Sequence, residues 1–285
     1  MLLYLCDTSR ERLDLVLYTM RLVTILSLWI VSWFPSTSLA FFQNIFNPNP
    51  PAKNSFQSGS VGIKTANKKL EDELLDVIAR LGENRLVNDA RISELVSSLE
   101  KAPSIPKPAI APEVYGRWKL IHTNNANTAS PIQRKAVDSS SFAIYQDIVL
   151  NDKDQLVVSQ VVKFSDNAEL KVDALASTSA YPLPELTERQ GDGKILGINI
   201  LGVSLVGEEA KEDDSRPDSR IKFVFDEGNF ELGSFKIPYP VPFRLPLLRD
   251  AVKGWIDITY MSERVRISRG NKGTTFILVK GESDS

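Results

Sequence analysis

The sequence predicts a mainly β protein, an antiparallel barrel preceded by a short helical hairpin. Two observations predict this class: from Tyr115 onward hydrophobic residues recur with a period of two, whereas helical spacing is confined to residues 70–100. Candidate strands, separated by turn-forming clusters, are 117–123, 142–150, 155–164, 169–176, 194–206, 219–226, 229–237, 255–260, 264–269 and 274–280. Because no helical pattern separates them, a barrel or a strongly curved sheet is expected, and a barrel removes strand edges that aggregate.

The clearest alternation lies in residues 219–226. Ile221, Phe223 and Phe225 face one way, whereas Lys222 and Asp226 face the other. This pattern predicts a sheet with one dry side and one wet side.

The helical pattern before the barrel is interrupted once. Its first part runs from Leu70 to Leu81 and ends at Gly82, and its second part spans Ile92 to Leu99, with Asn88 or Asp89 as the expected cap. Residues 70–100 therefore form a hairpin whose apolar faces need a partner surface. Residues 101–114, rich in proline, then form a stiff strap that leads to a barrel at 115–281.

The N-terminus has the layout of a targeting leader. An apolar run at residues 22–34 follows Arg21 and precedes Ser38 and Ala40, which is typical of a signal peptide over residues 1–40, and Met20 stands where such a signal would begin. The run is shorter than the about 20 apolar residues of a spanning helix, so we expect no transmembrane span in the mature protein.

Residues 41–69 contain four lysines, three serines and no acidic residue, which is typical of a disordered transit peptide. A signal peptide followed by a transit peptide resembles the bipartite presequence of plastid proteins in algae with secondary plastids. The alternative is a secreted protein with a disordered N-terminus, although a secreted domain would more often carry disulfides.

Composition excludes several classes of function. The formal net charge of −2 gives no basic field for nucleic acid, and any membrane contact must be local. Cys6 lies in the leader, so the mature protein has no disulfide, thiolate nucleophile or cysteine-based metal site. His122 is the only histidine, and a packed structural role is favoured over a role as general base. We expect no metal and no cofactor, and no catalytic motif is present.

Residues 235–254 form a distinctive insertion with four prolines. Its apolar and cationic side chains alternate, and we expect contact with a lipid surface through Phe243, Leu247, Leu248, Arg244 and Arg249. Packing of a proline-stiffened connection on the end of the barrel is an equally open alternative.

The first strand opens with Gly116-Arg117-Trp118, which resembles the Gly-x-Trp signature of lipocalin-type barrels. In those folds the tryptophan closes one barrel end beneath an arginine from the last strands. Arg266 and Arg269 are the available partners for Trp118, in a cation–π contact of about 0.5 to 2 kcal/mol.

The C-terminal segment carries the most specific resemblance. Residues 266–271, Arg-Ile-Ser-Arg-Gly-Asn, followed by Gly273 and the apolar stretch 276–279, resemble the plastid lipid-associated protein family, also called fibrillins or plastoglobulins. The resemblance spans about residues 70–280. Where the family has a leucine-aspartate pair before its arginine, this chain has Met261-Ser262, so the aspartate's role is missing or is taken by Glu263 or Asp257.

The resemblance implies a lipocalin-like barrel in the stroma, at thylakoids or on plastoglobules, binding isoprenoids, carotenoids, quinones or fatty acyl chains. We expect Phe223, Phe225, Phe235 and His122 to line the ligand site, because an apolar cavity favours apolar cargo. One alternative is an enzyme on an isoprenoid or fatty-acid substrate, with His122, Asp257 or Glu263 as acid or base. Another is a structural lipid-droplet coat whose barrel is filled by its own side chains.

Overall fold

The computed structural model describes residues 61–82, 85–86, 88–124, 142–184, 186, 212–239, 243–249, 252–271 and 273–281. The chain divides into two compact units, Met1–Gly59 and Ser60–Ser285, and every described residue belongs to the second. The proposed signal peptide, most of the transit-like segment and the candidate strand at 194–206 lie outside the described residues.

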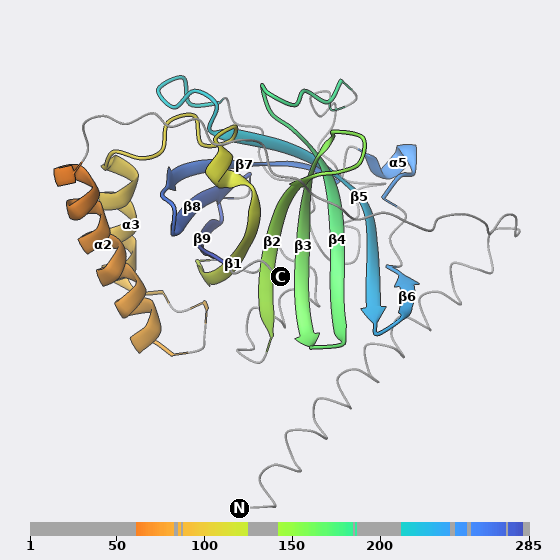
Figure 1. Cartoon of the computed structure of the whole chain (residues 1–285), viewed down its shortest axis with the longest axis horizontal. Coiled ribbons are helices and arrows are strands. Elements are labelled where there is room, and N and C mark those ends of the chain that lie inside the picture. The colour runs from red at the N-terminus through yellow and green to blue at the C-terminus, as the bar shows by residue number, and fades with distance from the viewer. Residues whose placement is uncertain are drawn as a thin grey trace, which may run out of the picture. The chain divides into compact units, whose positions relative to one another are not determined.

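The described strands form one antiparallel sheet that closes into a ring (Figure 1). They are β1 (Gly116–Thr123), β2 (Ala143–Leu150), β3 (Leu156–Ser165), β4 (Ala168–Ser177), β5 (Arg220–Leu232), β6 (Phe235–Pro238), β7 (Lys253–Met261), β8 (Val265–Gly270) and β9 (Thr275–Lys280). The order is β4-β3-β2-β1-β9-β8-β7-β5-β6, and pairing of β4 with β5 closes the ring. The predicted barrel is confirmed.

Strand β5 departs from the prediction of two separate strands at 219–226 and 229–237. It runs unbroken for 13 residues, because the irregularity falls inside the strand as a shift of register rather than as a turn. Opposite the step from Asp173 to Ala174, the partner on β5 moves from Glu227 to Phe225, so Asp226 is an extra residue. The turn comes later, at Gly233, whose φ of 58° suits a residue without a side chain.

Two helices precede the barrel, α2 (Val61–Arg80) and α3 (Ala90–Lys101). Helix α2 begins nine residues before the expected start at Leu70, inside the segment expected to be disordered. Asp89 is the cap of α3, because its carboxylate accepts the main-chain N–H groups of Arg91 (2.7 Å) and Ile92 (3.1 Å). The expected helical hairpin is therefore present, with an earlier start.

The helices cover the outside of the ring at β7, β8 and β9. Tyr260, Ile267 and Ile277 share one buried cluster with side chains of both helices, among them Leu74 and Leu99. Successive side chains of a strand point to opposite faces of the sheet. The neighbouring positions Met261, Arg266 and Leu278 therefore face the barrel interior.

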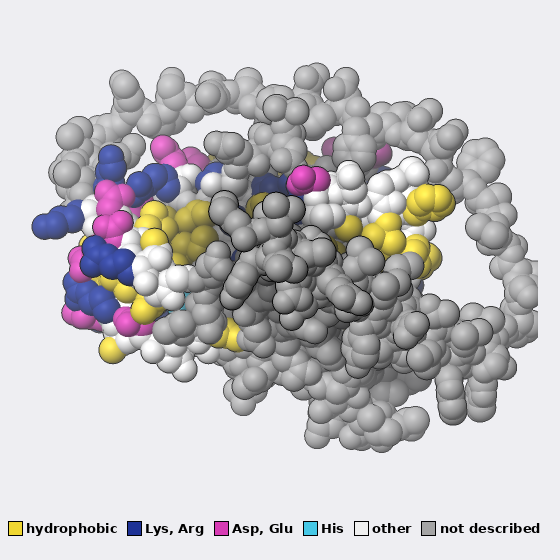
Figure 2. Space-filling model, turned by 90° about the horizontal axis from the view of Figure 1, so that it is seen from below, with side chains coloured by type: hydrophobic (Ala, Val, Ile, Leu, Met, Phe, Trp, Pro, Cys, Tyr) yellow, Lys and Arg dark blue, Asp and Glu magenta, His cyan; other side chains and the backbone are white. Residues whose placement is uncertain are grey.

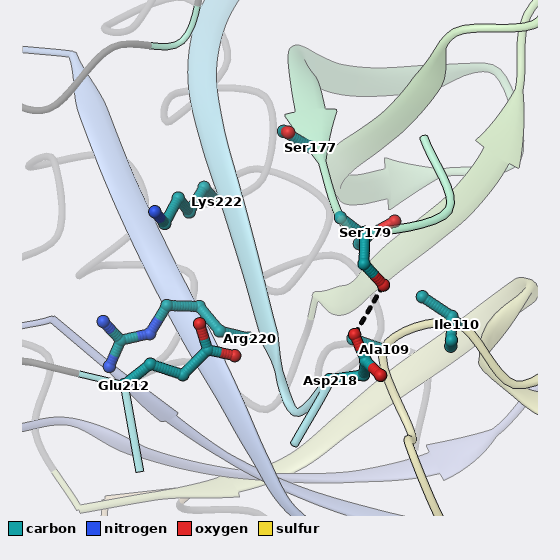
Figure 3. A pocket seen from close by; sticks show the side chains of 9 residues that line it. Ala109, Ile110, Ser177, Ser179, Glu212, Asp218, Arg220 and Lys222 are labelled. Carbon is teal, nitrogen blue, oxygen red and sulfur yellow. Dashed lines mark hydrogen bonds between the residues drawn. The ribbon is translucent and has the colours of Figure 1, made fainter. Parts of the chain in front are cut away.

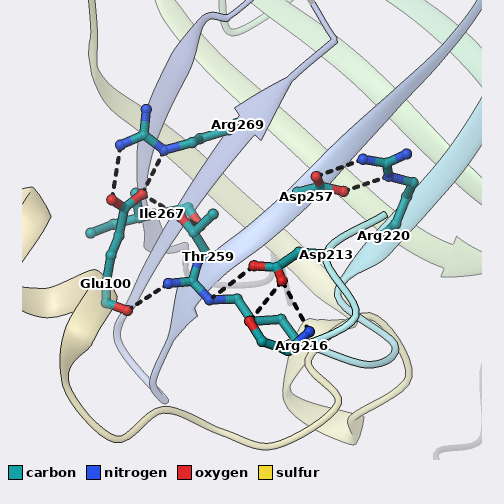
Figure 4. A network of polar contacts seen from close by, with 9 residues as sticks. Glu100, Asp213, Arg216, Arg220, Asp257, Thr259, Ile267 and Arg269 are labelled. Atoms are coloured by element: carbon teal, nitrogen blue, oxygen red, sulfur yellow. Dashed lines mark hydrogen bonds and ion pairs between the residues drawn. The ribbon is translucent and has the colours of Figure 1, made fainter. Parts of the chain in front are cut away.

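Charged contacts from each of the two helices fix the helical pair to the barrel. At α2, the Glu71 carboxylate accepts hydrogen bonds from Tyr260 Oη (2.7 Å) and from Arg264 Nη2 (2.7 Å). At α3, Glu100 accepts two bonds of 2.8 Å from Arg269 and one of 2.7 Å from Thr259 (Figure 4). The hairpin is therefore an integral part of the domain.

The strap that follows the helices crosses the ends of the strands, and main-chain hydrogen bonds hold it there. Ile105 N–H donates to the Met261 carbonyl (3.0 Å), and Ala109 N–H donates to the Asp218 carbonyl (2.8 Å). A 3-10 turn, η1 (Pro112–Val114), then delivers the chain to β1.

Candidate functional site

Rings on the inner face of β5 and rings from the segment after β6 form a continuous row, here called the aromatic row. The Phe223 and Phe225 rings lie 5.5 Å apart edge to face, and Phe225 lies 5.9 Å from Phe243. Phe243 stacks on Tyr239 at 6.0 Å, and Tyr239 lies 5.7 Å from Phe230. All these separations fall within the range of favourable aromatic pairs.

The register places this row inside the barrel. Ser268 lies two residues from the inward-facing Arg266 on β8, so it faces inward too, and so does its partner Ile258 on β7. Ile256, two residues before Ile258, pairs with Ile221, so Ile221 is also inward. Phe223 and Phe225 follow on the same face of β5, as the sequence alternation predicts.

Two rings of the row are incompletely covered. Ile221 on the same face is fully buried, and Phe243 and Phe230 are 5% and 9% exposed. Phe223 and Phe225 are only half-buried, although they lie within a central strand. The barrel's own side chains therefore leave apolar surface free at these two rings.

A glycine on β7 and a glycine on β5 make room for the row. Gly254 pairs with Phe223, and a Cβ built on Gly254 would meet the Phe223 ring at 2.8 Å. A Cβ on Gly228 would meet Tyr239 Cβ at 2.9 Å. Each glycine therefore allows a close approach that a larger residue would prevent.

Phe243 lies in the interior and not at an exposed position of the kind expected for contact with a lipid surface. Its side chain is 5% exposed because the ring packs between Phe225 and Tyr239. Arg244, from the same segment, donates two hydrogen bonds to Asp226, of 3.0 and 2.6 Å. These bonds hold the pKa of Asp226 below its usual value, against its burial. The alternative reading, packing on the barrel, describes Phe243.

The other residues of the 235–254 segment differ in exposure. Phe235 is 75% exposed at the start of β6 and not enclosed in the interior, where it was expected to line the ligand site. Arg249, the last residue of the helical turn α5 (Pro246–Arg249), donates to the Phe225 carbonyl at 3.0 Å. The side chains of Leu247 and Leu248 lie outside the described residues.

One end of the interior is occupied by a tryptophan and a buried cation. The Arg266 guanidinium carbon lies 4.8 Å from the centroid of Trp118, and both side chains have no exposed surface. Trp118 Nε1 donates to the Val114 carbonyl at 2.8 Å, which joins this end to η1. Arg266 Nη2 donates to Gln146 Oε1, and the Lys280 ammonium lies 4.5 Å from the Trp118 ring.

Of the two arginines considered as partners of Trp118, the structure brings only Arg266 to it. Arg269 lies on the opposite face of β8 and binds Glu100 of α3. Alternation along a six-residue strand separates the two arginines, because 266 and 269 differ by an odd number of residues.

His122 does not lie with the aromatic row. A shift of register between Leu120 and His122 makes His122 pair with Ile277, on the face that the helices cover. Burial lowers the pKa of His122, and the negative charge of Asp89 raises it by less. This histidine is a packed group near the start of α3.

The groups considered for acid–base chemistry do not converge. Asp257 is held by Arg220 through two bonds of 2.7 and 2.8 Å (Figure 4). Glu263 is exposed in the β7–β8 turn. Within the described residues no group of three or more His, Cys, Asp or Glu side chains is placed to hold a metal ion.

Ser262 shapes the turn between β7 and β8. Its hydroxyl accepts the main-chain N–H groups of Arg264 (3.1 Å) and Val265 (3.0 Å). Aspartate and serine side chains both accept bonds of this kind in turns.

A separate pocket of 160 Å³ lies where the strap meets the start of β5 (Figure 3). Hydroxyl and charged groups dominate its wall, including Ser177, Ser179, Asp218 and Lys222. Ser179 Oγ donates to Asp218 at 2.5 Å, and Lys107 of the strap pairs with Asp218 at 3.1 Å. This polar pocket does not suit an apolar cargo.

Sequence reasoning missed Tyr239, Gly254 and Gln146 as parts of the interior. Tyr239 stands between two prolines and resembles a loop residue, and Gly254 resembles a turn. Only the register of Gln146 opposite Trp118 indicates its inward orientation.

The chain was compared with known proteins. The family model PAP_fibrillin matches residues 68–184 and 208–279. A probable plastid-lipid-associated protein 12, chloroplastic, of Arabidopsis thaliana is 37% identical over 231 residues, which cover 79% of this chain and 46% of the relative. The chromoplast-specific carotenoid-associated protein C1 of an Oncidium hybrid cultivar is 25% identical over 262 residues, covering 80% and 73%.

The match to the Arabidopsis protein thus spans less than half of that relative's length. No solved structure matches the chain. Among the described residues, no helix combines the length and apolar character needed to cross a membrane. The barrel with its helical hairpin, the extent of the family match and the identity to the Arabidopsis relative lead to one conclusion: the chain belongs to the fibrillin family of plastid lipid-associated proteins.

Proposed function

We propose that this protein binds a lipophilic molecule inside its barrel, in a plastid, and that it acts as a carrier or organiser of lipids rather than as an enzyme. The aromatic row carries the proposal, because Phe223 and Phe225 leave apolar surface uncovered on the inner face. Covering such surface with an isoprenoid, carotenoid, quinone or acyl chain gains about 25 cal/mol per Å².

The names of the relatives support this class of cargo. They include a carotenoid-associated protein of chromoplasts and lipid-associated proteins of chloroplasts. The enzyme alternative has less support, since His122, Asp257 and Glu263 lie apart and Asp257 is bound by Arg220.

The experiment exposes the purified full-length chain to a plastid lipid extract and identifies retained molecules by native mass spectrometry. We expect a retained pigment, quinone or acyl lipid that is lost in Phe223→Ala and kept in Phe235→Ala, the same change at an exposed ring. Turnover of an added lipid would establish the enzyme instead. An empty barrel that still binds droplets would establish the coat protein.

The plastid location rests on the leader and on the chloroplast and chromoplast relatives. In an alga with a secondary plastid, residues 1–69 fused to a fluorescent protein are expected to reach the plastid stroma. Residues 41–69 alone should stay in the cytosol, because entry would require the signal peptide first. Secretion of the 1–69 fusion would refute the bipartite presequence.

A second activity, contact with a lipid surface, is favoured by exposed apolar side chains at one side of the barrel. Phe235 is 75% exposed and Leu245 is 47% exposed. In the sequence they lie on either side of Phe243, which is buried in the interior. Figure 2 shows hydrophobic side chains at the surface on the side where Figure 1 draws β6. We assign the surface contact to Phe235 and Leu245, and the double change to serine should abolish flotation with plastid-lipid vesicles. Unchanged flotation would contradict it.

A further inference from the structure

Within the described residues, the interior of the barrel contains a cation with no anionic partner. Arg266 is fully buried on the inner face, and the one hydrogen bond it makes there is the bond that Nη2 donates to the neutral amide of Gln146. Its Nε and Nη1 have no hydrogen-bond partner, and no ion pair of Arg266 occurs among the described residues. Burial alone lowers its pKa to about 9. Buried arginines normally face carboxylates, because an unpaired buried charge is costly.

A second donor without a partner lies beside it. Ser268 is two residues from Arg266 on β8, so both side chains point inward. Ser268 is 1% exposed, and its hydroxyl also has no partner. Nearby, the Lys280 ammonium is satisfied by the carbonyls of Glu113 and Tyr115 and supplies positive charge, not an acceptor. The inner face here therefore offers donors and positive charge, and no acceptor among the described residues binds Nε or Nη1 of Arg266 or the hydroxyl of Ser268.

The cationic end and the aromatic row lie at opposite ends of β7. Arg266 is opposite Met261, and Phe223 is opposite Gly254. Seven residues separate Met261 from Gly254, or about 23 Å along the strand at the usual rise of 3.3 Å per residue. The inward positions between them on β7 are Ile256 and Ile258. The inward side chains between the two ends are therefore apolar and are chemically suited to the tail of a long apolar chain.

From this arrangement we propose that the lipid bound in the barrel is an acid, a long-chain carboxylate whose head group binds Arg266 and Ser268 and whose tail reaches the aromatic row. This inference rests on the proposed function, because it assigns the chemistry of the cargo held in the same interior. A carboxylate provides only acceptors and matches the planar fork of a guanidinium. A neutral pigment or quinone leaves Arg266 uncompensated.

The experiment measures binding of oleate and of methyl oleate to the full-length chain by displacement of a fluorescent fatty-acid probe. The two lipids share the same chain and differ in the charge of the head group. We expect oleate to bind about 10- to 100-fold more tightly, as hydrogen bonds to a charged group imply. Arg266→Met should bring the two affinities together by weakening oleate alone. The matched control is Arg269→Met on the outer face of β8, which should keep the preference.

The outcomes separate this inference from the function it rests on. Equal binding of acid and ester by the unaltered chain overturns the acid head-group site and leaves lipid binding intact. A preference that survives in Arg266→Met, with circular dichroism unchanged, overturns the role of Arg266. Binding of neither lipid, with no retained lipid from plastid extract, overturns the proposed function. Should Arg266→Met fail to fold, the ratio of the two affinities in the unaltered chain still decides the question.

Discussion

Replacing Glu71 by alanine should weaken the whole domain, although Glu71 lies on a helix outside the barrel. Glu71 is 3% exposed and accepts bonds from Tyr260 Oη (2.7 Å), Arg264 Nε (3.0 Å) and Arg264 Nη2 (2.7 Å). Burial raises the pKa of Tyr260, and the hydrogen bond that its hydroxyl donates to Glu71 raises it further. The hydroxyl of Tyr260 therefore stays protonated as a donor.

The expected cost has two parts. Removing the acceptor breaks the hydrogen bond that the buried Tyr260 hydroxyl donates, which costs about 2 kcal/mol. The ion pair with Arg264 adds about 0.5 kcal/mol, because the arginine side chain is 43% exposed and screened by water. The sum is about 2.5 kcal/mol of the free energy of unfolding.

Urea unfolding of the full-length chain, followed by far-UV circular dichroism, measures this loss. The matched control is Asp72→Ala, which removes an acidic partner of the same Arg264 at a position 52% exposed and should cost less than about 0.5 kcal/mol. In a double-mutant cycle, Glu71→Ala and Tyr260→Phe should be strongly non-additive. Equal losses for Glu71→Ala and Asp72→Ala would refute the reasoning.

Three further predictions concern packing and charge. Phe243→Ser should lower the free energy of unfolding by about 3 kcal/mol, whereas Phe235→Ser should change it by less than about 0.5 kcal/mol, and equal effects in urea unfolding would contradict their assigned burial. Gly254→Ala should cost about 1–3 kcal/mol because the new Cβ meets the Phe223 ring at 2.8 Å, and an unchanged melting temperature would contradict that contact. The Glu100 carboxyl is raised in pKa by burial, but bonds from Arg269 and Thr259 outweigh this and leave the pKa lowered from 4.5. Its contribution to stability should therefore be complete above pH 4.5 and lost as the pH falls through the lower folded-state pKa, and Glu100→Gln should flatten this acid limb in urea titrations at several pH values.

The surface segment shows where sequence reasoning stopped. Residues 235–249 contain Phe235 and Phe243 among prolines and arginines, and nothing local distinguishes the two rings. In the structure Phe235 is exposed at the start of β6, which pairs with the end of β5. Phe243 is buried, because its ring lies close to Gly228 of β5. The sequence also contains no indication of the partners of Arg244 and Arg249. One of these partners, Asp226, is the extra residue at the shift of register in β5, and this shift cannot be read from the sequence.

The candidate site was predictable only in part. Alternation within 219–226 indicated that Phe223 and Phe225 share a dry face, because strand periodicity is a local property. Which face of β1 holds His122 depended on an irregularity between Leu120 and His122. A shift of one residue moves a side chain to the other face of the sheet.

The sequence by itself determined the class of the fold, the helical hairpin, the family and the pairing of Trp118 with an arginine of the C-terminal strands. These features follow from periodicity and local motifs, which depend on neighbouring residues. Only the tertiary structure decided that the arginine is Arg266, that Arg269 instead holds the helices through Glu100, and that Arg266 has no anionic partner among the described residues. Burial and pairing of a charge depend on groups more than a hundred residues apart, such as Gln146 and Arg266, and only the folded barrel brings them together.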